Sequence, residues 1–296
     1  MKYVEPSQHI WVNTWEEISR EAGIAYSATS EVYRLFAQDN GPSLLISGCD
    51  DFSIRYQDRH HPNDDIIKHT TCFDGSGLDN SKYMDLAIPC PVERDKCRSG
   101  DKFVAKIDRF AKFTFPSLPT WLTKWYVTNL DVVEDNMLWL PFGLNDSGHG
   151  SSILPNYMER PKKKLLYVNF RVNTMQREQL VSYYRNVPWA TVRTENVPVE
   201  TYLEEMAEHK YVLSPFGNGL DCYRTYEAMY LNCVPILEDA IFSRHMLRNG
   251  LPVGVVSNLF ALSAEDLEAR WDEFSNADYD YSTITKGFWK KVFCGV

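Results

Sequence analysis

The chain has 296 residues, of which 44% are hydrophobic and 24% are charged. This composition excludes a largely disordered chain, and the length suits two domains of about 150 residues each. The formal net charge of −9 argues against a nucleic-acid-binding protein, because such proteins usually present a basic face.

The seven cysteines are scattered, and none forms a C-x-x-C pair, so the spacing of a zinc site is missing. Free cysteines within predicted strands and helices fit a reducing compartment. The N-terminus lacks the apolar core of a signal peptide, and no apolar run reaches the ~18 residues that a membrane span needs. We therefore expect a soluble, cytoplasmic protein without a membrane span.

The first half of the chain has an irregular pattern of apolar runs. Five of them predict strands, at residues 9–14, 43–49, 65–71, 125–129 and 137–143. Residues 14–23 and 30–38 have helical periodicity. Together they predict an α/β domain over residues 1–150, and the Gly-, Ser-, Asn- and Asp-rich segment 142–156 predicts the linker that follows it.

Strands and helices alternate strictly in the second half. The predicted strands are residues 164–170, 189–193, 210–215, 233–239 and 252–258, and the predicted helices are 173–186, 199–209, 221–232 and 263–274. Such alternation with short connections predicts a parallel, doubly wound sheet over residues 151–296. A last helix at about residues 283–293 has three aromatic side chains, and we expect it to pack back on the first domain.

A glycine-rich turn joins the third strand of this half to its third helix. Gly217 and Gly219 allow φ > 0 and a close approach of the backbone to a ligand, and Asp221 is the expected N-cap of the helix. Arg224 lies in the first turn of that helix, where the helix dipole disfavours a cation. A phosphate bound over the helix N-terminus would supply its partner, and Glu227 is suited to accept both hydroxyls of a ribose. The alternative is that Arg224 and Glu227 form an exposed i,i+3 ion pair.

Two other nucleotide-binding motifs, the P-loop and the dinucleotide fingerprint, can be compared with this turn. No lysine follows the glycines, so a P-loop kinase or ATPase is disfavoured. The spacing Gly217-x-Gly219-x-x-Cys222, with Glu238 and Asp239 about 20 residues further on, approaches the dinucleotide fingerprint. An NAD-dependent or nucleotide-sugar-modifying Rossmann enzyme is therefore an alternative.

The segment "YVLSPFGNGLDCYRTYEAMYLNCVPIL", residues 211–237, closely resembles the C-terminal signature of exostosin-like glycosyltransferases, the inverting family 47. In that signature a strand ending in S-P-x-G-x-G-x-D precedes a helix with R-x-x-E-A and a strand with C-x-P-I. Residues 165–180 and 126–143 are more weakly similar to other segments of this family. Asn232 departs from the glycine that is commoner at the end of the signature helix, and the rest of the first half has no position-by-position match.

The resemblance implies a GT-B fold, in which two Rossmann-like doubly wound domains face an interdomain cleft. Residues 1–150 would hold the acceptor sugar of a glycan, and residues 151–296 would hold a UDP-sugar donor. The chain is also similar to compact, anchorless relatives in bacteria and large algal viruses, including viral β-xylosyltransferases, which implies UDP-xylose as the donor. The expected donor-binding residues are Arg171, Arg177, Ser214, Gly217, Asn218, Gly219, Asp221, Arg224 and Glu227.

We expect a metal-independent reaction without a cofactor, in which a helix N-terminus and Arg224 stabilise the departing UDP. The D-x-D sequence Asp278-Tyr279-Asp280 lies far from any strand end and is interpreted as a surface loop. Inversion also needs a carboxylate base, and Asp51 and Asp74 follow predicted strands of the first half. Either aspartate could equally be a turn former.

Three histidines are weaker candidates: His60 and His61 fall in a stretch with the composition of an exposed loop, and His149 falls in the predicted linker. The leading hypothesis is thus an inverting glycosyltransferase. A nucleotide-sugar-binding protein without a working base is the third alternative, beside the NAD-linked enzyme.

Overall fold

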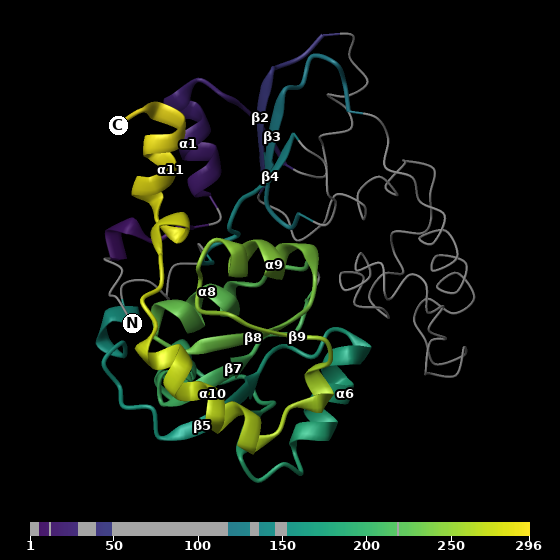
Figure 1. The fold of residues 1–296 in the computed structure, drawn as a ribbon, viewed down its shortest axis with the longest axis vertical. Helices are drawn as coiled ribbons and strands as arrows, with labels where there is room; N and C mark the ends of the chain where they lie inside the picture. Colours follow the sequence, from purple (N-terminus) through teal and green to yellow (C-terminus); the bar gives the residue numbers. More distant parts are fainter. Residues whose placement is uncertain are drawn as a thin grey trace, which may run out of the picture.

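The computed structural model describes residues 6–11, 13–28, 40–48, 118–130, 136–145, 153–217 and 219–296. Within these ranges the chain forms two parallel β-sheets, which are stacked along the long axis of the molecule in Figure 1. Helices α8 and α9 lie between the two sheets in this view. The α/β class with parallel sheets, predicted from the alternation of strands and helices, is confirmed.

The four-stranded sheet comes from the first half of the chain. Its strands run parallel in the order β1-β2-β3-β4, with bounds β1 Ala25–Ala28, β2 Leu44–Gly48, β3 Lys124–Val127 and β4 Met137–Trp139. Three of these strands fall within or next to predicted runs, whereas β1 was not predicted. The predicted strand 9–14 is wrong, because His9 and Trp11 each make only an isolated bridge before α1 (Thr14–Ala22) begins.

The predicted strand at residues 65–71 and the predicted helix at residues 30–38 lie outside the described residues.

The five-stranded sheet comes from the second half of the chain. Its strands are β5 Lys164–Asn169, β6 Ala190–Arg193, β7 His209–Leu213, β8 Val234–Glu238 and β9 Gly254–Val256. The order β6-β5-β7-β8-β9 means that the chain first builds to one side of β5 and then crosses to the other side. The strand order therefore reverses between β5 and β7, and ligands of open parallel sheets bind at the carboxyl ends of strands at such a point.

Four helices follow strands within this sheet, and a fifth follows the last strand. Their bounds are α6 Met175–Tyr184, α7 Val199–Ala207, α8 Tyr223–Tyr230, α9 Ile241–Arg248 and α10 Ala264–Asn276. Helix α8 ends at Tyr230, and Asn232, in the turn that follows, adopts a φ of 58°. Asparagine tolerates this left-handed conformation, so the departure from the family's glycine is compatible with the turn.

The last helix, α11 (Lys286–Cys294), lies beside α1 at one end of the molecule (Figure 1). The rings of Trp289 and Trp15 meet edge to face with centroids 5.4 Å apart, and Lys286 Nζ is 2.6 Å from Glu17 Oε2. Contacts between the first and last helices thus tie the two ends of the chain together.

The largest hydrophobic core cluster includes buried residues of both sheets, among them Trp125, Val127 and Phe142 from the first half and Phe216 and Tyr226 from the second. Apolar burial therefore joins the two halves directly. The boundary at residues 150 and 151 stays a prediction. No helix in the described ranges is both long and apolar enough to cross a membrane.

Candidate functional site

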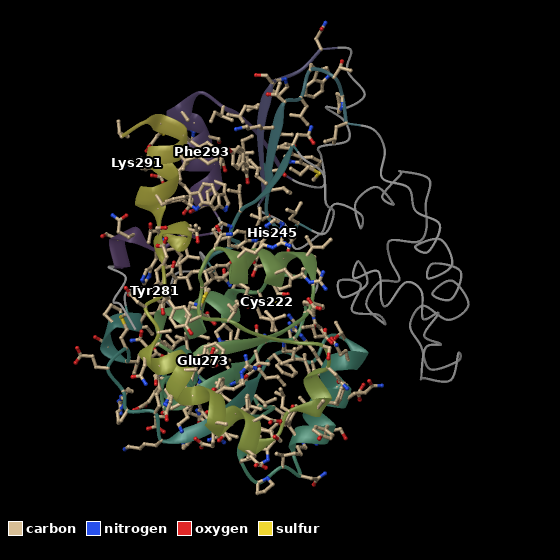
Figure 2. All side chains as sticks on the ribbon, in the orientation of Figure 1. Cys222, His245, Glu273, Tyr281, Lys291 and Phe293 are labelled. Atoms are coloured by element: carbon tan, nitrogen blue, oxygen red, sulfur yellow. The ribbon has the colours of Figure 1, made fainter. Side chains whose placement is uncertain are left out.

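The reversal of strand order places the candidate site at the carboxyl ends of β5 and β7. Asn169 ends β5, the loop that follows it carries Phe170 to Asn173, and the loop after β7 carries Ser214 to Cys222 and leads into α8. Figure 2 labels Cys222 at the start of α8, in the region between the two sheets. The glycine turn identified in the sequence therefore lies where an open parallel sheet binds its ligand.

Helix α8 begins at Tyr223, and its N-cap lies one residue later than predicted. Its N-cap is Cys222, in extended conformation and without a side-chain cap, so the assignment of Asp221 as N-cap is wrong. The carboxylate of Asp221 accepts hydrogen bonds from the Phe142 amide at 3.2 Å and from the Tyr226 hydroxyl. The Asp221 amide donates to Asn129 Oδ1 at 2.8 Å. These hydrogen bonds join Asp221 to the residues that follow β3 and β4, and they satisfy polar groups that are buried there.

Burial raises the pKa of Asp221 to about 7, although the Tyr226 hydroxyl and the Phe142 and Cys222 amides oppose the shift. Its side chain is nearly inaccessible, at 2% exposure, and Oδ1 has no hydrogen-bond partner among the described residues. Asp221 therefore joins the two sheets and is not available to touch a ligand.

Arg224 is held at the start of α8 by the last residue of β5 and the residue after it. Its Nε donates to the carbonyl oxygen of Asn169 at 2.8 Å, and its guanidinium carbon lies 5.3 Å from the centre of the Phe170 ring. Its Nη1 is buried and has no hydrogen-bond partner within the part of the chain that the structure describes. A buried cationic donor that is left unpaired is costly, so an anion bound here would be stabilised.

Glu227 lies one turn further along α8 and does not pair with Arg224. The Tyr202 hydroxyl of α7 donates to Glu227 Oε2 at 2.6 Å, while Arg224 Nε donates to the carbonyl oxygen of Asn169. The alternative prediction, an exposed i,i+3 ion pair between Arg224 and Glu227, is therefore wrong. Burial raises the pKa of Glu227, while the Tyr202 hydrogen bond and the charge of Arg224 lower it.

Arg177 is buried at the start of α6 and fastens the two loops together. Its guanidinium group donates five hydrogen bonds, to the carbonyl oxygens of Arg171, Pro215 and Phe216, to Asn173 Oδ1 and to Cys222 Sγ. A guanidinium group has five N–H donors, so none remains for a phosphate. The structure thus gives Arg177 a positioning role in place of the predicted contact with the donor.

Gly217 is required by this arrangement. It does not adopt a positive φ, but a Cβ atom at this position would lie 2.7 Å from Arg177 Nη2. The Gly217 amide donates to the carbonyl oxygen of Gly219 at 2.9 Å, which closes the turn. The close approach that the sequence predicted is therefore made to an arginine of the protein itself. Asn218, between the two glycines, lies outside the described residues.

The other two predicted donor-binding residues differ in exposure. Arg171 is exposed at the end of β5, beside the site, so its side chain can reach a ligand there. Ser214 is 1% exposed, and its hydroxyl is 3.0 Å from Thr225 Oγ1 of α8. Ser214 thus fixes α8 against β7 and does not face a ligand.

The acidic residues of the dinucleotide alternative already have partners. Asp239 forms a two-pronged ion pair with Arg244, with contacts of 2.5 and 2.7 Å. Glu238 is buried and accepts a hydrogen bond from Gln176 at 2.7 Å. A ribose that bound to Asp239 would have to displace an arginine.

The D-x-D sequence lies on the surface, as predicted. Asp278 and Asp280 are exposed between α10 and the last helix, and Asp280 Oδ1 accepts from the Ser282 amide at 2.8 Å, as in a turn. Within the described ranges, no group of three or more His, Cys, Asp or Glu side chains is arranged to hold a metal ion.

The candidate bases and histidines of the first half fall outside the described residues. This applies to Asp51, Asp74, His60, His61 and His149. Their proposed roles stay predictions.

Sequence reasoning missed three residues that shape the site: Asn169, Phe170 and Tyr202. Phe170 contacts two guanidinium groups, with the Cζ of Arg177 5.4 Å and that of Arg224 5.3 Å from its ring centre. Its position directly after a buried strand was a usable signal. No sequence signal links Tyr202 to Glu227, because they are 25 residues apart on different helices.

The family model of the RXYLT1 C-terminal domain matches residues 156–249, which include β5 to α9 and the whole candidate site. This match supports a glycosyltransferase of xylosyltransferase type. A comparison with curated proteins gives no match.

Proposed function

We propose that this protein is an inverting, metal-independent glycosyltransferase that moves xylose from UDP-xylose to a sugar hydroxyl of a glycan. The single observation that carries the proposal is the unpaired, buried Nη1 of Arg224 at the N-terminus of α8. The helix dipole and this cation together favour an anion at the point where the strand order reverses. The match to the RXYLT1 C-terminal domain over the same residues supports a sugar nucleotide as that anion.

The donor is proposed to lie with its diphosphate at Arg224 and its ribose at Glu227, and Arg171 is the exposed cation next to them. When the acceptor hydroxyl attacks the anomeric carbon, the bond from that carbon to the diphosphate breaks and UDP leaves with an added negative charge. A fixed guanidinium group and a helix N-terminus stabilise this charge in the transition state. No metal ion is needed for this electrostatic role.

The general base is proposed to be Asp51 or Asp74, from the first half of the chain. We further propose the GT-B arrangement, with residues 1–150 binding the acceptor and residues 151–296 the donor. Contacts made by residues after β3 and β4 support it, because Asn129 and Phe142 hydrogen-bond to Asp221 next to the glycine turn. An acceptor held by the first half would thus face the donor.

Titration calorimetry with UDP in the presence of EDTA tests the donor site. A charge-assisted hydrogen bond contributes about 1.5–3 kcal/mol, so Arg224→Ala should weaken UDP binding by roughly 10- to 100-fold. Arg185→Ala is the matched control, because Arg185 is exposed at the opposite end of α6, and it should bind UDP like the wild type. Binding of NAD without binding of UDP would refute the proposal.

Transfer from UDP-xylose to acceptor sugars tests catalysis separately from binding. Asp51→Asn and Asp74→Asn should each keep UDP affinity, and one of them should abolish transfer. Transfer that persists in both variants would exclude both aspartates as the base. UDP binding without transfer by the wild type would show a protein that binds nucleotide sugars without catalysis.

A further inference from the structure

Tyr202 has a place in the candidate site that its sequence position did not suggest. It lies on α7, which packs against α8, and its hydroxyl donates to Glu227 Oε2 at 2.6 Å. Burial raises the pKa of Tyr202 well above its ordinary value, so the hydroxyl stays a donor throughout the physiological range. One of the two Glu227 oxygens is therefore always held by the protein.

This hydrogen bond affects both the direction and the charge of the carboxylate. Two groups among the described residues lower the pKa of Glu227: the Tyr202 hydroxyl from α7 and Arg224 from its own helix. Burial acts in the opposite direction and is the larger effect. Without the hydroxyl, a larger fraction of Glu227 would be protonated, and a protonated carboxyl cannot accept two hydroxyl donors as well as a carboxylate does.

Tyr202 is itself supported from β5. Its ring lies 6.2 Å from the ring of Tyr167, whose hydroxyl donates to Glu205 Oε2 at 2.9 Å. Arg193 holds the same carboxylate, with its Nε 3.0 Å from each oxygen. The ring beside Tyr202 is therefore itself held by a hydrogen-bonded ion pair.

We propose that Tyr202 is a positioning residue for the donor's ribose: it holds one oxygen of Glu227 and leaves the other oxygen to the sugar diol. This inference rests on the proposed function and adds to it the group that sets the preference for a ribonucleotide. The ligand class is a nucleoside diphosphate with an intact 2′,3′-diol. A 2′-deoxy nucleotide would lose the contact that Tyr202 prepares.

The test compares the binding of UDP and 2′-deoxy-UDP to wild type, Tyr202→Phe, Glu227→Gln and the double variant. Tyr202→Phe keeps the ring and removes only the hydroxyl, so we expect UDP affinity to fall about fivefold or more and the preference for UDP over 2′-deoxy-UDP to shrink. In the Glu227→Gln background the same change should have little further effect, because Tyr202 acts through Glu227. Tyr183→Phe, at a tyrosine that is 43% exposed on α6, is the matched control.

Acidity gives a second readout that a purely structural role would not change. As the pH is lowered, the UDP affinity of Tyr202→Phe should fall more than that of the wild type, because more of its Glu227 becomes protonated. The titration of the nucleotide phosphate is common to all variants and cancels in the comparison.

Three results would overturn the inference. One is a Tyr202→Phe protein with unchanged UDP affinity, diol preference and pH dependence. Another is a loss of affinity that is equally large with and without Glu227, which would indicate a structural role and leave the proposed function intact. If the wild type binds no UDP, the proposed function falls and the inference falls with it.

Discussion

The buried carboxyl group of Asp221 should make the stability of the protein depend on pH in an unusual direction. It is 2% exposed, and its hydrogen-bond donors are the neutral Phe142 amide and Tyr226 hydroxyl. Its pKa is raised to about 7 from an ordinary value of 3.8. Between these values the folded protein binds a proton that the unfolded chain releases, so the free energy of unfolding falls as the pH rises.

The size of the effect follows from the shift in pKa. A shift of about three units at roughly 1.4 kcal/mol each gives up to about 4 kcal/mol, present in full below pH 4 and lost by the time the pH exceeds 7. Most acidic groups act in the opposite direction, because ion pairs lower their pKa values. The contribution of Asp221 must therefore be isolated by substitution.

Urea denaturation of the wild type and Asp221→Asn across about pH 4.5 to 8 isolates it. The amide has no charge to lose, so the difference in unfolding free energy between the two proteins should shift by up to about 4 kcal/mol in favour of the variant as the pH rises. Only the change with pH is used, so a constant offset from imperfect hydrogen bonding of the amide does not matter. Asp272→Asn, on the exposed face of α10, is the control and should follow the wild type.

Parallel curves for the wild type and Asp221→Asn would refute the reasoning, because they would mean that Asp221 titrates alike in the folded and unfolded chain. Tyr226→Phe offers an independent check. It removes a hydrogen bond that lowers the pKa of Asp221, so the decline in stability should move to higher pH. A shift to lower pH would contradict the assignment.

Two further predictions concern packing around the site and between the chain ends. Arg177→Lys leaves buried carbonyl oxygens without donors and should cost roughly 2–4 kcal/mol of stability. Gly217→Ala should cost less in the Arg177→Lys background than alone, because its Cβ would lie 2.7 Å from Arg177 Nη2. A double-mutant cycle in urea measures the coupling between the two changes, and additive costs would contradict it. Trp289→Ala should lower stability by about 3–5 kcal/mol in thermal unfolding, whereas Val292→Ala, at a residue that is 46% exposed on the same helix, should change it by less than about 0.5 kcal/mol. Equal effects of the two substitutions would show that α11 does not depend on its contact with α1.

Much of the second half could be predicted from its sequence. Strict alternation of apolar strand runs and amphipathic helices determined a parallel sheet, since parallel strands need a crossover between them. The glycine turn and Arg224 could also be located, because strand, turn and helix are local patterns. The first half was harder to predict: the apolar run at His9 to Trp11 is buried without joining a sheet, and short β1 gave little periodicity.

The partners of the site's side chains could not be predicted. In the sequence, Arg177, Arg224 and Arg171 are three similar cations near strand ends. In the structure Arg177 donates to buried carbonyl oxygens, Arg224 has a buried donor without a partner, and Arg171 is exposed. Asp221 looked like a helix cap and instead joins the two sheets.

The sequence by itself determined the parallel sheet of the second half, the position of the glycine turn and the presence of a cation in the first turn of α8, because each depends on neighbours within a few residues. Only the tertiary structure decided that Arg224 contacts Asn169 and Phe170, and that Glu227 accepts a hydrogen bond from Tyr202. Those choices depend on which buried polar groups meet when distant segments pack, and a buried group takes whichever partner the fold brings within hydrogen-bonding distance.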